Sequence, residues 1–125
     1  MSRLAGFAFY WLPVLAYATL ILTLSSQSHL PGASRLPDKP MHALEYSGFA
    51  FLLARALFPQ RGRPRTRQVA VAFVLAALFA AFDEYYQSYI PGRDCSVYDW
   101  LADLAGLSAA ISLLLLRTSK EQAPA

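Results

Sequence analysis

The chain has 125 residues, of which 56% are hydrophobic and only 15% are charged. A soluble domain carries about 25% charged residues, and a small one needs many polar groups because its surface is large relative to its volume. The composition therefore indicates one membrane-embedded domain and excludes a disordered chain. The single cysteine excludes an internal disulfide, and a net charge of +3 is too small to indicate nucleic-acid binding.

The first predicted transmembrane helix covers about residues 5–25. No charged residue occurs in the 25 positions from Leu4 to Ser28, and a hydrocarbon core of about 30 Å requires roughly 20 helical residues. A cleavable signal peptide is the alternative. Its apolar stretch would be only about 7–15 residues long, and Ser25-Ser26-Gln27 lacks the small-residue pattern of a cleavage site.

Three further spans are predicted over about residues 41–58, 68–89 and 97–116. The second is the least apolar, because His42, Glu45 and Arg55 interrupt it. The third has 15 uncharged residues, 68–82, before the Asp83-Glu84 pair, and prolines punctuate the ends of the apolar stretches. We therefore predict an all-α fold, an integral membrane bundle of four transmembrane helices that forms a single domain over residues 1–125.

The basic residues predict the orientation of this bundle. If the four spans alternate, eight basic residues lie on one side and three on the other, and an excess of basic residues favours the cytoplasm. Both termini are therefore predicted to be cytoplasmic. The arginine-rich loop could also suggest nucleic-acid binding, but an inner-face loop resting on anionic lipid already explains it. The inner group comprises Arg3, Arg55, Arg61, Arg63, Arg65, Arg67, Arg117 and Lys120, and the outer group comprises Arg35, Lys39 and Arg93.

The acidic residues gather on the outer side. Ionisable residues at membrane depth almost always face the bundle interior or a wet cavity. Because every span brings polar groups to this end, we predict an outward-facing polar pocket. Seven of the eight acids fall there: Asp38, Glu45, Asp83, Glu84, Asp94, Asp99 and Asp103.

Helical spacing supports this pocket. His42, Glu45 and Tyr46 follow an i, i+3, i+4 pattern that places them on one helical face. Asp83 or Glu84 forms a similar pattern with Gln87. Asp99 and Asp103 do so on the fourth span, together with Gly106, which is small enough to admit a neighbouring helix.

Several of these residues also have purely structural interpretations. Asp99 could cap the fourth helix, Lys39 could be an interfacial anchor, and His42 could form a structural pair with Glu45. Arg93 follows Pro91-Gly92, a turn that can direct its side chain over the helix ends, where it would contact an anionic ligand or pair with a carboxylate. An outer aromatic belt is predicted at Tyr85, Tyr86, Tyr89, Tyr98 and Trp100.

The order of these residues resembles the VanZ-like family of small bacterial membrane proteins. The resemblance rests on Ser25-Ser26-Gln27, on Asp38-Lys39-x-x-His42-x-x-x-Tyr46 and on Glu84-x-x-Gln87-x-x-x-Pro91-x-Arg93-x-x-Ser96-x-x-Asp99-x-x-x-Asp103-x-x-Gly106. It implies a multi-pass protein of the bacterial cytoplasmic membrane. The founding member is associated with low-level teicoplanin resistance. Position 103 is usually Asn in that family and is Asp here.

The leading functional hypothesis is that the outward pocket binds an anionic, lipid-linked ligand of the cell envelope. Lys39, His42 and Arg93 would supply positive charge or hydrogen-bond donors. A divalent cation bridging to phosphate is a further cofactor hypothesis, with His42, Glu84, Asp99 and Asp103 as candidate ligands. The full set of predicted ligand-binding residues is Gln27, Lys39, His42, Tyr46, Glu84, Gln87, Arg93, Ser96, Asp99 and Asp103.

Two other functions stay open at this point. A membrane enzyme could hydrolyse or transfer a group on an envelope lipid phosphate, with catalytic candidates His42, Glu84 and Asp99 and with Arg93 stabilising negative charge. A small proton-coupled transporter could use the chain of acidic groups and His42. Because four short spans without an internal repeat are few for a transporter, a homodimer is then expected.

Overall fold

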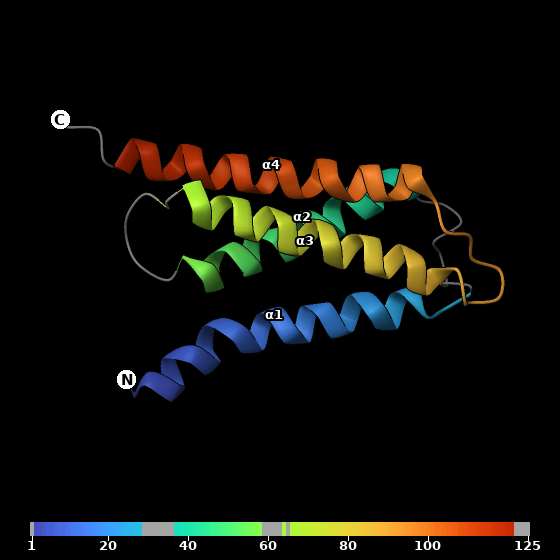
Figure 1. Cartoon of the computed structure of the whole chain (residues 1–125), viewed down its shortest axis with the longest axis horizontal. Coiled ribbons are helices and arrows are strands. Elements are labelled where there is room, and N and C mark those ends of the chain that lie inside the picture. The colour runs from blue at the N-terminus through green and yellow to red at the C-terminus, as the bar shows by residue number, and fades with distance from the viewer. Residues whose placement is uncertain (1, 29–36, 59–63, 65, 122–125) are drawn as a thin grey trace.

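The computed structural model describes residues 2–28, 37–58, 64 and 66–121, with side chains through Arg117, and this part of the chain is all-α. The four helices are α1 (Arg3–Ser25), α2 (Asp38–Leu57), α3 (Thr66–Gln87) and α4 (Val97–Glu121). They alternate in direction along one bundle (Figure 1). The predicted all-α fold of four helices is confirmed. We call the end where α1 and α3 finish and α2 and α4 begin the polar end, because the buried polar residues lie there.

Serine side chains cap the starts of α1 and α4. Ser2 precedes α1 and its hydroxyl accepts a hydrogen bond from the Ala5 N–H at 3.2 Å, which satisfies one of the free donors at a helix start. Ser96 does the same for α4, because its hydroxyl accepts from the Asp99 N–H at 3.3 Å. The ends of the four predicted spans agree with the ends of the observed helices to within a few residues.

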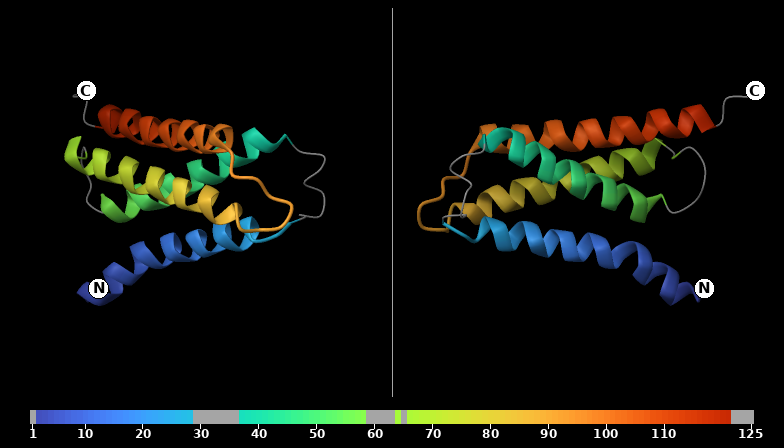
Figure 2. Two further views of the ribbon diagram at one scale, coloured as in Figure 1. Left: turned by 45° about the vertical axis from the view of Figure 1, so that its right-hand side comes forward. Right: turned by 180° about the vertical axis from the view of Figure 1, so that it is seen from behind.

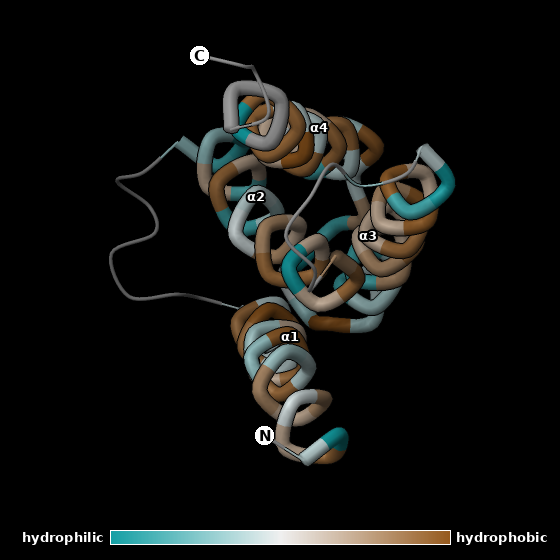
Figure 3. The backbone as a smooth tube through the Cα atoms, turned by 90° about the vertical axis from the view of Figure 1, so that its left-hand side faces the viewer, coloured by the Kyte–Doolittle hydropathy of each residue, from teal (hydrophilic) through white to brown (hydrophobic). Residues whose placement is uncertain are grey.

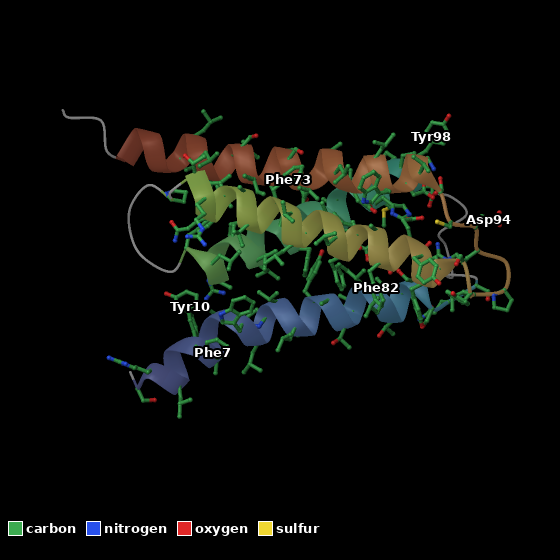
Figure 4. All side chains as sticks on the ribbon, in the orientation of Figure 1. Phe7, Tyr10, Phe73, Phe82, Asp94 and Tyr98 are labelled. Carbon is green, nitrogen blue, oxygen red and sulfur yellow. The ribbon has the colours of Figure 1, made fainter. Side chains whose placement is uncertain are left out.

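Three helices are long and apolar enough to cross a membrane by length and composition: α1, α3 and residues Val97–Arg117 of α4. Large apolar side chains on these helices point away from the bundle, and Leu12, Leu78 and Leu113 are each about three-fifths exposed. Such side chains suit the lipid that surrounds a membrane bundle. Figure 4 shows side chains along the outer face of α1 and α3, where Phe7, Phe73 and Phe82 are labelled.

Helix α2 is not among these three, since it carries Asp38, Lys39, Glu45 and Arg55. It packs against the other three helices and most extensively against α4. An end-on view shows it between α4 and α1 (Figure 3). The faces that pack against other helices hold its buried polar residues, and the side that they leave open carries the exposed apolar residues Met41, Leu44 and Phe51. Helix α2 therefore occupies the place of the predicted second span.

The core below the polar end is apolar. The rings of Phe49 and Phe79 stack with their centroids 4.8 Å apart, and Tyr46 packs beside both. At Gly106, an added Cβ would collide with the backbone carbonyl of Ala43, so α4 approaches α2 closely only because this residue has no side chain. This confirms the packing role predicted for Gly106.

The N-terminal half of α1 diverges from the rest of the bundle (Figure 2). It is tied back at one point, where the Arg55 guanidinium lies 4.6 Å from the ring centroid of Phe9 and 5.1 Å from that of Tyr10. A cation over an aromatic face is attracted by the ring. α1 thus packs against the bundle from about Tyr10 onward and is exposed at its start.

The charged residues divide between the two ends as the alternating spans predict. Arg3, Arg55, Arg67 and Arg117 belong to helix ends opposite the polar end, and Lys39 and Arg93 lie at the polar end. The cytoplasmic orientation of the termini stays a prediction. Arg35, Arg61, Arg63, Arg65 and the side chain of Lys120 lie outside the described residues.

Candidate functional site

His42 lies at the centre of a buried polar cluster at the polar end. Its side chain is 8% exposed, and its Nδ1 lies 2.9 Å from Asp103 Oδ1 and 3.8 Å from Glu84 Oε1. On the other side of the ring, Nε2 lies 4.0 Å from Asp99 Oδ2 and 3.9 Å from Asp38 Oδ1. Three helices contribute to this arrangement. We call the following six residues the His42 cluster: Asp38, Lys39, His42, Glu84, Asp99 and Asp103.

Helical spacing explains how the cluster is built. Asp38 and His42 are four residues apart on α2, and Asp99 and Asp103 are four apart on α4, so each pair lies on one face. Glu84 enters from α3. The close approach of α2 and α4 therefore brings two acids from successive turns of α4, Asp99 and Asp103, next to the His42 imidazole.

Lys39 connects the cluster to the surface. Its ammonium contacts Asp99, lies 3.6 Å from Asp38 Oδ2, and belongs to a side chain that is 51% exposed. The hydrogen bond that Lys39 donates to the Asp99 carboxylate raises the pKa of Lys39 above its ordinary value. Lys39 precedes the apolar part of α2 and carries its charge at neutral pH, so the cluster presents a cation to the outside.

The loop between α3 and α4 holds two of the acids in place. The Ser96 N–H donates to Glu84 Oε2 at 3.0 Å, and the Ser96 hydroxyl accepts from the Asp99 N–H at 3.3 Å. One residue thereby positions a carboxylate on α3 and the first turn of α4. In this position Ser96 organises the cluster without itself facing His42.

A second network adjoins the His42 cluster. The Tyr46 hydroxyl and Gln87 Nε2 both donate to Asp83 Oδ2 at 3.3 Å. Gln87 Nε2 also lies 3.3 Å from Ser25 Oγ, to which it donates. We call Ser25, Tyr46, Asp83 and Gln87 the Asp83 network. It joins α1, α2 and α3, whereas the His42 cluster joins α2, α3 and α4.

Four buried carboxylate oxygens have no hydrogen-bond partner within the described part of the chain. An unpaired buried carboxylate is costly unless a proton, a cation or a hydrogen-bond donor compensates it. Three of these oxygens belong to the two networks and one belongs to Glu45 on α2, so these acids have hydrogen-bonding capacity that the described side chains do not fill. These oxygens are Glu45 Oε1, Asp83 Oδ1, Glu84 Oε1 and Asp103 Oδ2.

The sequence matches one known family. Residues 9–118 match the family described as VanZ/LLP1. This chain belongs to the VanZ/LLP1 family. The matched region contains both networks and nearly all of the four helices, so the resemblance seen in the motifs is confirmed. No curated protein and no solved structure matches the chain.

With its apolar helices, this VanZ/LLP1 chain is a multi-pass membrane protein. Most of the residues predicted to bind a ligand come together at one end of it. Their roles in binding or catalysis stay predictions. Lys39, His42, Glu84, Asp99 and Asp103 meet in the His42 cluster with Ser96 beside them, and Tyr46 and Gln87 belong to the Asp83 network.

Two predicted ligand-binding residues, Arg93 and Gln27, lie at the polar end but belong to neither network. The Arg93 guanidinium donates to the backbone carbonyls of Gln27 at 3.2 Å and Leu24 at 3.3 Å. These carbonyls lie just beyond and within the last turn of α1, where a cation is favourable, and the Leu24 carbonyl also accepts from the Gln27 N–H at 3.1 Å. No acidic side chain in the described part of the chain lies within 4.0 Å of the Arg93 guanidinium. Gln27 takes part through its backbone, and its side chain is exposed.

Three residues that complete the networks were not among the predicted ligand-binding set: Ser25, Asp38 and Asp83. Helical spacing was the available signal for two of them, because Asp38 precedes His42 by four residues and Asp83 precedes Gln87 by four. Ser25 had no such signal, since its partner Gln87 is 62 residues away.

The arrangement offers ligands for a metal ion. Two groups of three side chains have ligand atoms that all lie within 4.8 Å of one another. One contains Asp38, His42 and Asp99, and the other, fully buried, contains His42, Glu84 and Asp103. All four predicted metal candidates belong to these groups. The arrangement therefore suits a cation or a proton held between helices.

Proposed function

We propose that this VanZ/LLP1 protein binds the anionic headgroup of a lipid-linked cell-envelope molecule at the polar end of its bundle. In this proposal the polar end faces outward from the bacterial cytoplasmic membrane. The observation that carries it is Lys39, a half-exposed cation on top of a buried charged cluster built by three helices. An ammonium is a suitable point charge for phosphate or carboxylate.

The surroundings of Lys39 support a ligand with an apolar tail. Met41 and Leu44 on α2 and Val97 and Leu101 on α4 are exposed beside the cluster. A molecule whose headgroup lies at Lys39 would have apolar side chains along which to lay its chain. The chain of such a ligand would stay in an apolar environment when it moves from the bilayer onto these side chains, so the headgroup could reach Lys39 without exposing the chain to water. A lipid-linked anion therefore fits both parts of this surface.

The distribution of buried polar residues favours binding over transport. Within the described residues, the buried polar side chains all lie at the polar end, and the core beyond them contains Phe49, Leu53, Leu107 and Ile111. A proton-coupled carrier requires ionisable or wet groups across the membrane. A carrier would therefore need a second copy of the chain, and we retain the homodimer as part of that alternative alone.

The His42–Asp103 pair favours one other candidate, an enzyme acting on a lipid phosphate. A carboxylate 2.9 Å from an imidazole nitrogen can orient the ring and stabilise its charged form. In such an enzyme His42 would act as a general base through Nε2, which faces Asp38 and Asp99. Release of phosphate or a change in lipid mass would distinguish the enzyme from a binding protein.

Binding is tested by native mass spectrometry of the purified chain in detergent. We expect the chain to retain a polyprenyl phosphate more strongly than the matching polyprenol, which lacks the charge. Lys39→Ala should lower retention of the phosphate form about tenfold, the usual effect of losing one charge-assisted hydrogen bond. The lipid mass after incubation also reports any hydrolysis.

Arg67→Ala is the matched control, because it removes one exposed positive charge at the opposite end of the bundle. It should leave retention unchanged. Equal retention of the phosphate and the alcohol, or an equal effect of the two substitutions, would contradict the proposal.

The family resemblance extends this proposal to glycopeptide resistance. A protein that binds lipid-linked envelope molecules lowers the number of them that are free to bind the antibiotic. Expression in a teicoplanin-sensitive bacterium should therefore raise the inhibitory concentration of teicoplanin, and expression of Lys39→Ala at the same level should not.

A further inference from the structure

We propose that His42, Glu84 and Asp103 form a binding site for one divalent transition-metal ion. The site would keep a coordination position open for an oxygen of the headgroup, and that last step alone rests on the proposed function. The three side chains come from α2, α3 and α4, so an ion bound here would join three helices at the polar end.

The distances suit a metal ion. Donor atoms that bind one ion at about 2.0–2.2 Å lie roughly 3–4 Å from each other. His42 Nδ1 lies 2.9 Å from Asp103 Oδ1 and 3.8 Å from Glu84 Oε1, and ligand atoms of all three residues lie within 4.8 Å of one another. Small side-chain movements would bring all three onto one ion.

Unsatisfied buried oxygens point to a missing cation. Glu84 Oε1 and Asp103 Oδ2 are buried without a hydrogen-bond partner among the described residues, and both residues are more than nine-tenths buried. One protonated imidazole balances only one of these two carboxylates. A divalent cation bound by both carboxylates and a neutral imidazole would leave no net charge in the interior.

The surrounding groups already hold the ligands in place. The Ser96 N–H donates to Glu84 Oε2 at 3.0 Å, which leaves Oε1 directed toward His42. On the far side of the imidazole, Nε2 faces the carboxylates of Asp38 and Asp99. At 3.9 and 4.0 Å these carboxylates are too far from Nε2 for a hydrogen bond. A small movement would let one of them accept the Nε2 proton, which is how a carboxylate behind a metal-binding histidine orients the ring and raises its basicity.

The other group, Asp38, His42 and Asp99, suits an ion less well. Asp38 is exposed, and Asp99 contacts the Lys39 ammonium, which would repel a metal ion beside it. Asp38 and Asp99 are therefore better placed as partners of the imidazole than as ligands of the ion.

The donor set indicates which ions would bind. One imidazole and two carboxylates suit Zn²⁺ or Mn²⁺, whereas Ca²⁺ prefers oxygen ligands alone. Three protein ligands leave at least one position open on a tetrahedral or larger coordination sphere. A phosphate oxygen is a suitable ligand for that position, and the ion would then offset the repulsion between the headgroup and the surrounding acids.

The test measures metal binding by the full chain in detergent after treatment with a chelator. Mn²⁺ should bind with a stoichiometry of about one ion per chain. Pulsed electron paramagnetic resonance should detect coupling to one imidazole nitrogen. Glu84→Gln and Asp103→Asn should each weaken binding at least tenfold.

Asp83→Asn is the matched control, since Asp83 is an equally buried acid next to Glu84 that belongs to the other network. It should keep both the stoichiometry and the nitrogen coupling. Should a variant fail to fold, the wild-type stoichiometry and nitrogen coupling alone decide. A wild-type chain without bound Mn²⁺ or without nitrogen coupling would overturn the site, as would equal weakening in all three variants.

Lipid binding distinguishes this inference from the proposed function. Retention of polyprenyl phosphate that survives complete chelation, in a chain that binds no Mn²⁺, would overturn the metal site and leave the proposed function intact. One bound Mn²⁺ with no preference for polyprenyl phosphate over polyprenol would support the site and contradict the proposed function.

Discussion

Arg93 fastens the end of α1 to the loop that follows α3. Gly92 adopts a φ of +81°, a left-handed conformation that glycine adopts without strain. This turn directs the next residue back toward α1, where the guanidinium donates to Leu24 and Gln27 carbonyls. Lys39, by contrast, directs its charge onto side-chain carboxylates. Of these two cations at the polar end, Arg93 therefore binds the C-terminal end of α1, and Lys39 binds the acids of the His42 cluster.

Replacing Arg93 should loosen α1. Arg93→Ala removes two hydrogen bonds from a charged donor to backbone carbonyls, a loss of about 1–3 kcal/mol in the free energy of unfolding. Arg93→Lys should keep most of this stability, because an ammonium can also donate to carbonyls at a helix end. The melting temperature of the purified chain in detergent measures both effects.

Glu84→Gln should not restore the stability of Arg93→Ala, since no carboxylate in the described part of the chain contacts the guanidinium. Rescue by Glu84→Gln or Asp99→Asn would instead mean that Arg93 neutralises a carboxylate, and this role for the α1 terminus would be wrong.

At the scale of elements, the contact between α2 and α4 determines the geometry of the His42 cluster. Gly106 lies on α4 one turn beyond Asp103, where α4 touches the backbone of α2 at Ala43. Ala43 is the neighbour of His42. The two helices therefore meet at their closest point directly beside the cluster, which is what brings His42 Nδ1 within 2.9 Å of Asp103.

Adding one methyl group at this contact should separate the two helices. Gly106→Ala places a Cβ against the rigid backbone of Ala43, and overpacking of this kind costs about 1–3 kcal/mol or more. We expect a lower melting temperature and, in the same variant, weaker Mn²⁺ binding because His42 and Asp103 move apart.

Gly48→Ala is the comparison for this prediction. Its Cβ would meet the end of a flexible side chain, the Tyr17 hydroxyl, at 2.6 Å. Tyr17 can swing away at the cost of its hydrogen bond to the Glu45 carbonyl. Equal destabilisation by the two substitutions would show that the α2–α4 contact is not specially tight.

At the scale of the whole molecule, the bundle has a polar end and an apolar remainder. Asp94 and Tyr98 lie at the polar end, and Tyr10 lies toward the other end (Figure 4). Tyr85, Tyr89 and Tyr98 are exposed at this end, whereas Tyr86 and Trp100 are half-buried. The outer aromatic belt therefore stays a prediction. The buried charges thus lie at one end of the bundle, where the half-exposed Lys39 connects them to the surface.

Cys95 tests which side of the membrane this end faces. It is exposed, lies in the α3–α4 loop, and is the only cysteine in the chain. A membrane-impermeant maleimide should label it in intact cells. This expectation rests on the outward orientation predicted from the excess of basic residues at the other end.

The matched variant carries Thr66→Cys in a Cys95→Ser background, which moves the thiol to the start of α3 at the opposite end. This variant should react only after the membrane is permeabilised. The reverse pattern of labelling would place the His42 cluster on the cytoplasmic side. It would contradict the proposal that the polar end binds a ligand on the outer side of the membrane.

The sequence by itself determined the helices and the end at which charge collects. Long uncharged stretches and prolines at their ends are local properties, and local properties can be read along the chain. The position of each acid along its span also sets its depth. For these reasons the four helices and the polar end could be predicted before any contact was known.

Only the tertiary structure decided which partners meet. Asp83 and Glu84 are adjacent acids, yet the rotation of α3 directs one to Tyr46 and the other toward His42. Arg93 binds backbone carbonyls, which every residue has and which leave no mark in a sequence. Pairing depends on the rotation and closest approach of packed helices, and these depend on contacts between residues far apart in the chain.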